Sequence, residues 1–310
     1  MTVNNLAENM AVRGHDGTGA PALGRRNAFG RPGDGNSIGA LLVDAGKLSL
    51  DDAERVLRLQ REQKLRFGEA AVQLGLVGPA DIEVALSQQF EYPYLRPDDP
   101  ALDAELIAAY QPFGQQVEAL RGLRSQLMLR WFNADAGRKA LAVVSPERGE
   151  GRSFVAANLA VVFSQLGEHT LLIDADLRHP RQHSLFRVDN AIGLSSILSG
   201  RAGREAAQRV EGLVDLSVLP AGAPPPNPQE LLARPSFGRL LDDLAGEFDV
   251  IIIDTPAGNA YADAQTVAAR AGGALMVVRA NTSRVRPAGL LVQNLSAANA
   301  KLAGAVMNSF

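Results

Sequence analysis

The sequence predicts an α/β fold in which a doubly wound, mostly parallel sheet is preceded by a small all-α domain. Three observations support this prediction. Short apolar runs alternate with helical patterns from residue 141 onward, a Gly-rich loop follows the first of these runs, and a pattern beginning at Ile38 returns 29 residues later at Phe67. With 310 residues, 46 % of them hydrophobic and 21 % charged, the chain is long enough for two globular domains.

Composition narrows the classes of function. A formal net charge of -3 gives no general reason to expect a nucleic-acid partner, and none is expected. The absence of cysteine excludes disulfides, thiolate metal sites and cysteine nucleophiles. No apolar run approaches the roughly 20 residues that span a bilayer, and the N-terminus lacks the apolar core of a signal peptide. We therefore expect a cytoplasmic protein.

Changes in composition along the chain predict four segments. Residues 1–36 are Gly-rich, polar and aperiodic, so we expect a disordered tail. Residues 37–92 carry the repeat and predict a helical domain, and the Pro-rich stretch 93–104 is expected to be a linker. Residues 105–310 predict the α/β domain.

Each copy of the repeat predicts a short helix, a glycine turn and a second helix. Gly46 and Gly75 end the first helix of each copy, and Ser49 or Gly78 opens the second. The copies resemble the N-terminal domain of type II secretion and pilus assembly ATPases, some members of which bind cyclic di-GMP through paired motifs. That resemblance implies a cyclic di-GMP site formed by Ile38, Gly39, Gln60, Arg66, Gly68 and Gln89.

The first copy departs from the cyclic di-GMP motif. Ser37 stands where the family has arginine, and Phe67 replaces a leucine in the second copy. An arginine both hydrogen-bonds phosphate and stacks on guanine, whereas serine does neither well. The alternative is that the glycines form turns and the leucines form a core, which makes the domain a docking module.

The Gly-rich loop Ser145–Ser153 lies between the apolar run Leu141–Val144 and a helical pattern that starts at Phe154. In this order, backbone N–H groups and a helix N-terminus bind nucleotide phosphates, and a Ser or Thr hydroxyl binds Mg²⁺. Arg152 occupies the position at which the P-loop consensus has lysine. The predicted nucleotide-binding residues are Gly149, Glu150, Gly151, Arg152, Ser153 and Phe154.

Acidic residues follow two further apolar runs. Asp174 and Asp176 come after one run, and Asp254 comes after another. In an open α/β sheet these residues belong at the carboxyl ends of the strands, where ligands bind, and carboxylates are suitable Mg²⁺ ligands. Together with the loop, they predict a P-loop NTPase that binds ATP and Mg²⁺.

Residues 105–310 resemble the bacterial tyrosine kinase domain, and within it the kinases that determine exopolysaccharide chain length. The resemblance rests on hydrophobic-Asp-x-Asp-x-Arg at 171–178, hydrophobic-Asp-Thr-Pro at 251–256 and Gly222-Ala-Pro-Pro-Pro-Asn-Pro-Gln-Glu-Leu-Leu232. It implies a regulator of capsule and exopolysaccharide synthesis that works with ATP.

The same resemblance implies roles for individual residues. Ser153, Asp174 and Asp254 would hold Mg²⁺, and Asp174 and Asp176 would place the metal and activate the attacking hydroxyl. Arg152 would hold the β and γ phosphates. The cytoplasmic tail of a membrane-spanning polysaccharide co-polymerase would complete the nucleotide site, which would keep the chain peripheral to the inner membrane.

Glu118, Arg121 and Arg124 are spaced three apart and so share one helical face. By themselves they indicate a solvated charged face. They also match the Glu-x-x-Arg-x-x-Arg helix through which bacterial tyrosine kinases self-associate, which implies a homo-oligomer contact.

Two departures from the kinase pattern keep alternatives open. The four tyrosines, Tyr92, Tyr94, Tyr110 and Tyr261, do not form the C-terminal cluster that autophosphorylating members carry, and Arg152 replaces the loop lysine. One alternative is a regulatory adaptor that binds nucleotide with negligible turnover. Another is a partitioning or cell-division ATPase, against which Glu147 argues because that class carries lysine there.

Overall fold

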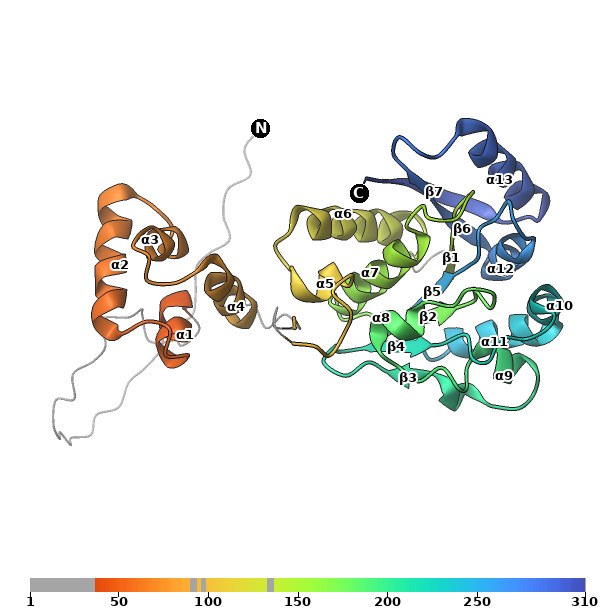
Figure 1. Cartoon of the computed structure of the whole chain (residues 1–310), viewed down its shortest axis with the longest axis horizontal. Helices are drawn as coiled ribbons and strands as arrows, with labels where there is room; N and C mark the ends of the chain where they lie inside the picture. Colours follow the sequence, from red (N-terminus) through yellow and green to blue (C-terminus); the bar gives the residue numbers. More distant parts are fainter. Residues whose placement is uncertain (1–36, 90–93, 96–98, 133–136, 310) are drawn as a thin grey trace, which may run out of the picture.

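The computed structural model describes residues 37–89, 94–95, 99–132 and 137–309. The tail predicted at 1–36 lies outside the described residues. The described residues form a helical unit, α1 to α4, and an α/β unit that contains every later element (Figure 1). Within these ranges, no helix combines the length and the apolar character needed to cross a membrane.

The helical unit contains two copies of a helix–turn–helix pattern. Its helices are α1 (Ile38–Asp44), α2 (Leu50–Gln63), α3 (Phe67–Gln73) and α4 (Pro79–Gln89). Each helix of the second copy begins 29 residues after its counterpart, at 67 against 38 and at 79 against 50. Ser49 caps α2, because its hydroxyl accepts the N–H of Asp52 at 3.1 Å. The predicted helices of both copies are therefore present.

A single apolar cluster holds these four helices together. Two glycines permit the close helix contacts: a Cβ on Gly39 would lie 3.0 Å from the Phe67 ring, and one on Gly68 would lie 2.9 Å from Ile82. The glycines predicted for the motif therefore also have a packing role. The cluster consists of Leu42, Leu48, Val56, Ala70, Ala71, Val77 and Ala85.

A seven-stranded sheet in the order β3-β4-β2-β5-β1-β6-β7 forms the centre of the α/β unit. All neighbouring strands run parallel except β3 and β4. The doubly wound, mostly parallel sheet predicted from the sequence is confirmed. The strands are β1 (Ala140–Val144), β2 (Thr170–Asp174), β3 (Gln208–Arg209), β4 (Leu216–Leu219), β5 (Val250–Asp254), β6 (Gly273–Arg279) and β7 (Lys301–Asn308).

The short apolar runs that the sequence shows from residue 141 onward form β1, β2, β4, β5, β6 and β7, whereas β3 was not predicted. This edge strand has only two residues, Gln208 and Arg209, and both are polar. It exists because its backbone pairs antiparallel with β4. A strand of this kind has no hydrophobic periodicity by which the sequence could reveal it.

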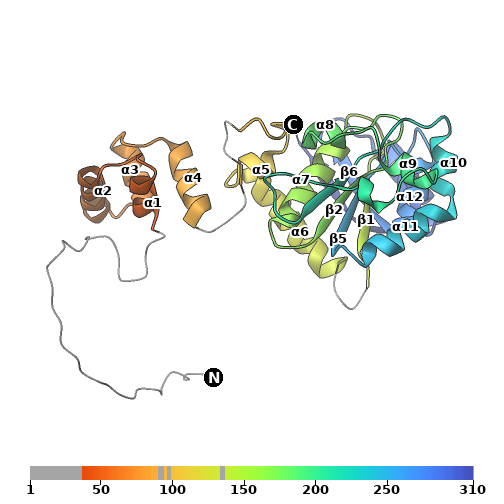
Figure 2. The ribbon, with the colours of Figure 1, turned by 90° about the horizontal axis from the view of Figure 1, so that it is seen from below.

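Helices cover both faces of the sheet (Figure 2). One face of the sheet packs against α5 to α8 through strand residues such as Val143 and Leu172. The other face packs against α9 to α13 through the next residues along the same strands, Val144 and Ile173. The alternation arises because successive strand residues point to opposite faces. The helices are α5 (Ile107–Tyr110), α6 (Gln115–Arg130), α7 (Arg152–Ser164), α8 (Gln182–Phe186), α9 (Leu194–Leu198), α10 (Pro228–Ala233), α11 (Pro235–Ala245), α12 (Asp263–Ala271) and α13 (Val285–Ala297).

The segment 99–110 packs against the α/β unit ahead of its first strand. Leu102 is buried in the same core as β1, and the Tyr110 hydroxyl accepts the Leu102 N–H at 2.9 Å. Asn158, in the middle of α7, accepts the Ala108 N–H at 2.9 Å and donates to the Glu105 carbonyl at 2.9 Å. The segment is thus hydrogen-bonded to the helix that follows the Gly-rich loop.

Candidate nucleotide-binding site

The Gly-rich loop connects β1 to α7 at the carboxyl edge of the sheet. Gly149 and Gly151 have φ of +77° and +88°, a left-handed backbone that residues with a Cβ rarely adopt. α7 starts at Arg152, so the N–H groups of its first turn, including those of Ser153 and Phe154, have no acceptor within the helix. Backbone N–H groups in this arrangement form an anion-binding site.

Glu150 stabilises the loop from inside. Its side chain is buried, and its carboxylate accepts the Glu147 N–H at 2.8 Å and the Ser283 hydroxyl. Asn308, at the end of β7, donates to the Glu150 carbonyl at 3.3 Å. The carboxylate of this predicted nucleotide-binding residue therefore contacts the protein's own loop. A contribution of Glu150 to phosphate binding would come from its backbone N–H.

Asp174 and Asp254 are direct neighbours in the sheet, since β2 and β5 pair in register at these two residues. The Asp174 carboxylate is fully buried and accepts the backbone N–H groups of Asp176, Arg181 and Gln182 at 3.1, 2.9 and 2.9 Å. Burial, and next the nearby Asp254, raise the pKa of Asp174 to about 8, against the effect of these N–H donors. Asp174 thus organises the turn that leads from β2 into α8.

Arg152 is directed at the carboxylates, and its side chain is only 10 % exposed. Its Nε lies 3.2 Å from Asp254 Oδ1, and its two terminal nitrogens lie 2.9 Å from Ser145 Oγ and 3.2 Å from Asp176 Oδ2. Every guanidinium nitrogen therefore has a separate protein partner. The predicted contact of Arg152 with the β and γ phosphates stays a prediction.

The predicted Mg²⁺ ligands do not form an open metal site in this arrangement. Asp254 Oδ1 accepts from Arg152, its Oδ2 accepts from Gln182 Nε2 at 2.7 Å, and the Ser153 hydroxyl also bonds to this carboxylate. Burial raises the pKa of Asp254, while the Arg152 charge opposes that rise. Across the described part of the chain, no group of three or more His, Cys, Asp or Glu side chains is arranged to hold a metal ion.

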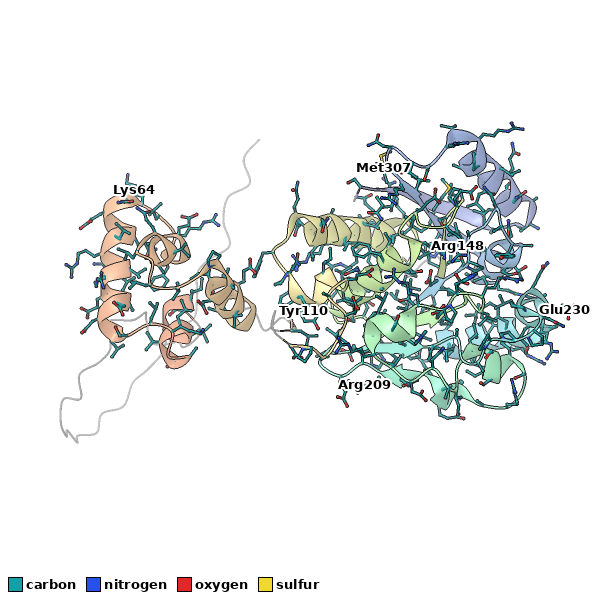
Figure 3. The ribbon with its side chains drawn as sticks, viewed as in Figure 1. Lys64, Tyr110, Arg148, Arg209, Glu230 and Met307 are labelled. Carbon is teal, nitrogen blue, oxygen red and sulfur yellow. The ribbon has the colours of Figure 1, made fainter. Side chains whose placement is uncertain are left out.

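A cavity lies over the loop, lined by predicted site residues and by a basic rim. Asp176, Ser153 and residues 148–152 of the loop line it, and so do His179 and Arg181. Arg148, which Figure 3 labels in the α/β unit, has a terminal nitrogen 3.4 Å from His179 Nε2. Positive side chains around an anion-binding loop are suited to a polyphosphate. The cavity brings that polyphosphate next to the Asp176 carboxylate.

Comparison with known proteins identifies the family of this chain. The sequence profile of the family described as cellulose biosynthesis protein BcsQ matches residues 139–298. The tyrosine-protein kinase YwqD of Bacillus subtilis is 36 % identical over 207 residues, which cover 67 % of this chain and 86 % of that protein. The chain belongs to the family of bacterial tyrosine-protein kinases.

Two solved structures match most of this chain. The chimerical protein CapA2B2 is 34 % identical with a TM-score of 0.62, and the match covers 73 % of this chain and 98 % of that one. The kinase domain of the Escherichia coli tyrosine kinase ETK is 33 % identical with a TM-score of 0.63, covering 66 % and 79 %. The resemblance of the α/β unit to bacterial tyrosine kinases and the P-loop NTPase fold predicted from the sequence are confirmed, whereas the resemblance of the repeats to secretion ATPases stays a prediction.

Sequence reasoning missed two side chains that shape the site in this kinase-family chain. Gln182 bridges the Asp254 carboxylate and the Ser153 carbonyl, but it begins a five-residue helix that no periodicity predicts. Asp263, fully buried at the start of α12, pairs with Arg178 at 2.7 Å. The Arg178 guanidinium also lies 4.0 Å from the centre of the Tyr261 ring. In the sequence, Asp263 is indistinguishable from an ordinary acidic residue in a first helical turn.

The predicted oligomer-contact residues lie on α6 but differ in surroundings. Glu118, with a side chain 74 % exposed, forms an ion pair with Arg121 at 3.2 Å. Arg124 donates to the Val162 carbonyl of α7 at 2.7 Å, so part of its side chain packs inside the unit. Glu118 is therefore the member of the set most available to another subunit.

The predicted cyclic di-GMP residues also differ in accessibility. Arg66 is exposed just before α3, and Ile38, Gln60, Gly68 and Gln89 are partly buried. Gly39 is buried against the Phe67 ring. Arg66 is thus the predicted residue whose side chain is most open to a ligand.

Proposed function

We propose that this chain binds ATP at the loop 145–154 and acts as a kinase-type P-loop ATPase. One observation carries the proposal: the left-handed Gly149 and Gly151, the start of α7, and the basic side chains of Arg148 and Arg181 surround a single cavity at the carboxyl edge of the sheet. Backbone donors and positive charge at this edge match the requirements of a nucleotide triphosphate. Membership of the tyrosine-kinase family supports the same activity.

A matched pair of glycine variants tests ATP binding. Gly149→Ala and Gly167→Ala each place a Cβ on a left-handed backbone with nothing within 4 Å, but only Gly149 lies in the loop. Calorimetric titration with ATP should show at least about tenfold weaker binding for Gly149→Ala, which is about 1.4 kcal/mol, and little change for Gly167→Ala. Equal ATP affinities in the two variants would contradict phosphate binding at this loop.

For phosphoryl transfer, we assign the orienting role at the attacking hydroxyl to Asp176. Its Oδ1 accepts the backbone N–H groups of Arg178 and His179 at 3.3 and 3.0 Å, which fix the carboxylate at the cavity. Asp176→Asn should reduce turnover by roughly 10²–10⁴-fold, the usual contribution of a positioned acid–base group, while ATP binding persists. Full turnover in this variant would remove Asp176 from the mechanism.

We place this activity in exopolysaccharide biosynthesis and chain-length control. The tyrosine-kinase family and the match to the BcsQ profile support this context. The proposed partner is the cytoplasmic tail of a membrane-spanning polysaccharide co-polymerase, which would hold the chain at the inner membrane. ATP turnover measured with and without a synthetic tail peptide tests the pairing. Stimulation is expected, and identical rates would speak against the tail as activator.

Self-association through α6 is part of the proposal, because Glu118 presents an exposed negative charge on this helix. Glu118→Arg should shift the protein toward monomer in light scattering, since it replaces an attractive charge with a repulsive one. Glu211→Arg, at another exposed acid, is the matched control. A mass that stays the same in both variants would exclude α6 as the contact.

A regulatory adaptor with negligible turnover is the second candidate. The observation that favours it is the engagement of Arg152 with Asp176 and Asp254, which pairs its charge with carboxylates of the chain itself. In that case, cyclic di-GMP at the helical unit would change the assembly state. Calorimetry with cyclic di-GMP should show binding to the unmutated chain. Arg66→Ala should weaken this binding, whereas the control Arg58→Ala, at another exposed arginine, should leave it unchanged. If the unmutated chain releases or absorbs no heat on titration with cyclic di-GMP, regulation by this ligand is excluded.

A further inference from the structure

The Arg152 guanidinium lies where the two site strands and the loop converge. Its three nitrogens contact Asp254 at the end of β5, Asp176 beyond the end of β2, and Ser145 at the end of β1. The Asp176 and Asp254 side chains are 6 % and 0 % exposed. The positive charge between two buried carboxylates is therefore supplied by the chain itself.

Two carboxylates buried this closely require a positive charge. Without one, their repulsion and the loss of hydration would destabilise the folded state. A guanidinium suits the task because it stays charged and presents donors in a fixed planar fork, which here serves three acceptors in different directions. A lysine ammonium is a compact point charge at the end of a flexible stem, so it would not reproduce these three contacts together.

A divalent metal would compete for the same oxygens. Both oxygens of Asp254 already accept a hydrogen bond, one from Arg152 and the other from Gln182. Oδ2 of Asp176 faces Arg152 as well, and its Oδ1 accepts the N–H groups of Arg178 and His179. A metal bound between these aspartates would have to displace the guanidinium into the cavity.

The phosphates have other positive groups available. Arg148, His179 and Arg181 also line the cavity, together with the residues at the start of α7, whose N–H groups have no acceptor within the helix. Arg152 is thus not the sole source of positive charge for a nucleotide. Its position is consistent with a charge-balancing role within the protein.

We propose that Arg152 is a built-in counter-cation that replaces Mg²⁺ between Asp176 and Asp254, so that this chain binds ATP with little dependence on Mg²⁺. The inference rests on the proposed ATP site and specifies its metal requirement. It makes Arg152 a positioning residue that fixes the two carboxylates.

ATP titrations in Mg²⁺ and in EDTA test this metal requirement. The unmutated chain should bind ATP in the two buffers with affinities that differ by less than about tenfold. Arg152→Lys should gain a larger dependence, because a lysine leaves oxygens of Asp176 and Asp254 open to the metal. Arg209→Lys makes the same change at an exposed position on β3 and should behave like the unmutated chain. A loss of affinity of tenfold or more on removing Mg²⁺ from the unmutated chain would overturn the inference.

Thermal unfolding without nucleotide provides a second readout. Mg²⁺ should not change the Tm of the unmutated chain, whereas it should raise the Tm of Arg152→Gln by at least about 2 °C, since it would restore charge balance. If Arg152→Gln fails to fold, the ATP titrations of Arg152→Lys in Mg²⁺ and in EDTA decide the role of Arg152 instead. A rise in Tm for the unmutated chain as large as for the variant would overturn the inference.

The two readouts separate this inference from the proposed function. If the unmutated chain binds ATP in neither buffer, the proposed function fails, and the Mg²⁺ effect on Tm still decides the role of Arg152. If it binds ATP only with Mg²⁺, the ATP site stands and the counter-cation role fails.

Discussion

The helical unit and the α/β unit differ in how far apart in the sequence their stabilising contacts lie. In the helical unit, each helix packs against another from the same 37–89 stretch, around one small apolar cluster. In the α/β unit, Ala140 of β1 pairs with Ile251 of β5, and the site residues Asp174 and Asp254 meet from strands 80 residues apart in sequence. A local repeat therefore builds one unit, and long-range strand pairing builds the other together with its site.

The difference also has a thermodynamic side. A small domain such as the helical unit buries a smaller fraction of its surface on folding, so its free energy of unfolding is small. The α/β unit, in contrast, has a hydrophobic core on each face of its sheet. We expect the helical unit to unfold first. The single tryptophan of the chain, Trp131, is buried in the α/β unit, so its fluorescence reports on that unit alone, while far-ultraviolet circular dichroism reports on both.

Matched leucine truncations should give the largest effect. Leu159→Ala and Leu42→Ala each remove a fully buried side chain, at a typical cost of about 2–5 kcal/mol. In urea unfolding, Leu159→Ala should move the Trp131 transition. Leu42→Ala should unfold the helical unit, visible in circular dichroism, and leave the Trp131 transition in place. A Trp131 transition that moves equally in both variants would mean that the two units unfold as one.

The pH dependence of stability should have opposite signs in the two units. The pKa of Asp174 is raised to about 8 in the folded state. Its favourable contribution to the free energy of unfolding is therefore complete below pH 3.8 and is lost as the pH rises to about 8. In the helical unit, the pKa of Asp81 is lowered, chiefly by its hydrogen bond with Lys47. The stabilisation that comes from Asp81 therefore exists above pH 3.8 and is lost as the pH falls.

Asp174→Asn tests this sign in the α/β unit. The variant should flatten the decline in unfolding free energy between pH 4 and 8 by more than about 1.4 kcal/mol, the value of one pKa unit. The Trp131 urea transition measured across this pH range supplies the data. Asp242→Asn, at an exposed carboxyl on α11, is the control. An unchanged slope in Asp174→Asn would show that Asp174 is ionised throughout.

The next effect concerns the glycines at the helix contacts. Gly68→Ala places a Cβ 2.9 Å from Ile82, so an overpacking cost of about 1–3 kcal/mol competes with a gain of about 1 kcal/mol in helix propensity. A net loss is expected in circular dichroism melts. Gly122→Ala in α6, where the new Cβ meets nothing within 4 Å, should instead stabilise the α/β unit. Stabilisation by both changes would show that the helical unit adjusts freely at this contact.

The smallest effect should come from the ion pair between Lys47 and Asp81. Their nitrogen and oxygen are 2.9 Å apart, but the side chains are 56 % and 28 % exposed. Lys47→Gln should cost only about 0.2–1 kcal/mol, and the loss should vanish at high salt because ions screen exposed charges. Melting curves at low and high salt measure it. A loss that persists at high salt would point to packing by the Lys47 stem.

The sequence was sufficient for features that depend on neighbouring residues. The repeat, its turn glycines, six of the seven strands and the Gly-rich loop all follow from local patterns and were predicted at the right positions. Asp174, Asp176 and Asp254 were expected at one edge because parallel strands end on the same side. Local dihedral preferences and the burial of alternate residues act over a few positions, so a single sequence reveals them.

Only the tertiary structure decided which partners the site residues take. The family resemblance implies that Arg152 would hold phosphates and that Asp174 would hold the metal, and both roles stay predictions. In the fold, Arg152 reaches Ser145, Asp176 and Asp254, and Asp174 accepts three backbone N–H groups from the turn after β2. Side-chain direction at a shared sheet edge depends on the balance of charge and hydrogen bonds among groups that are distant in sequence. That balance exists only once β1, β2 and β5 are paired.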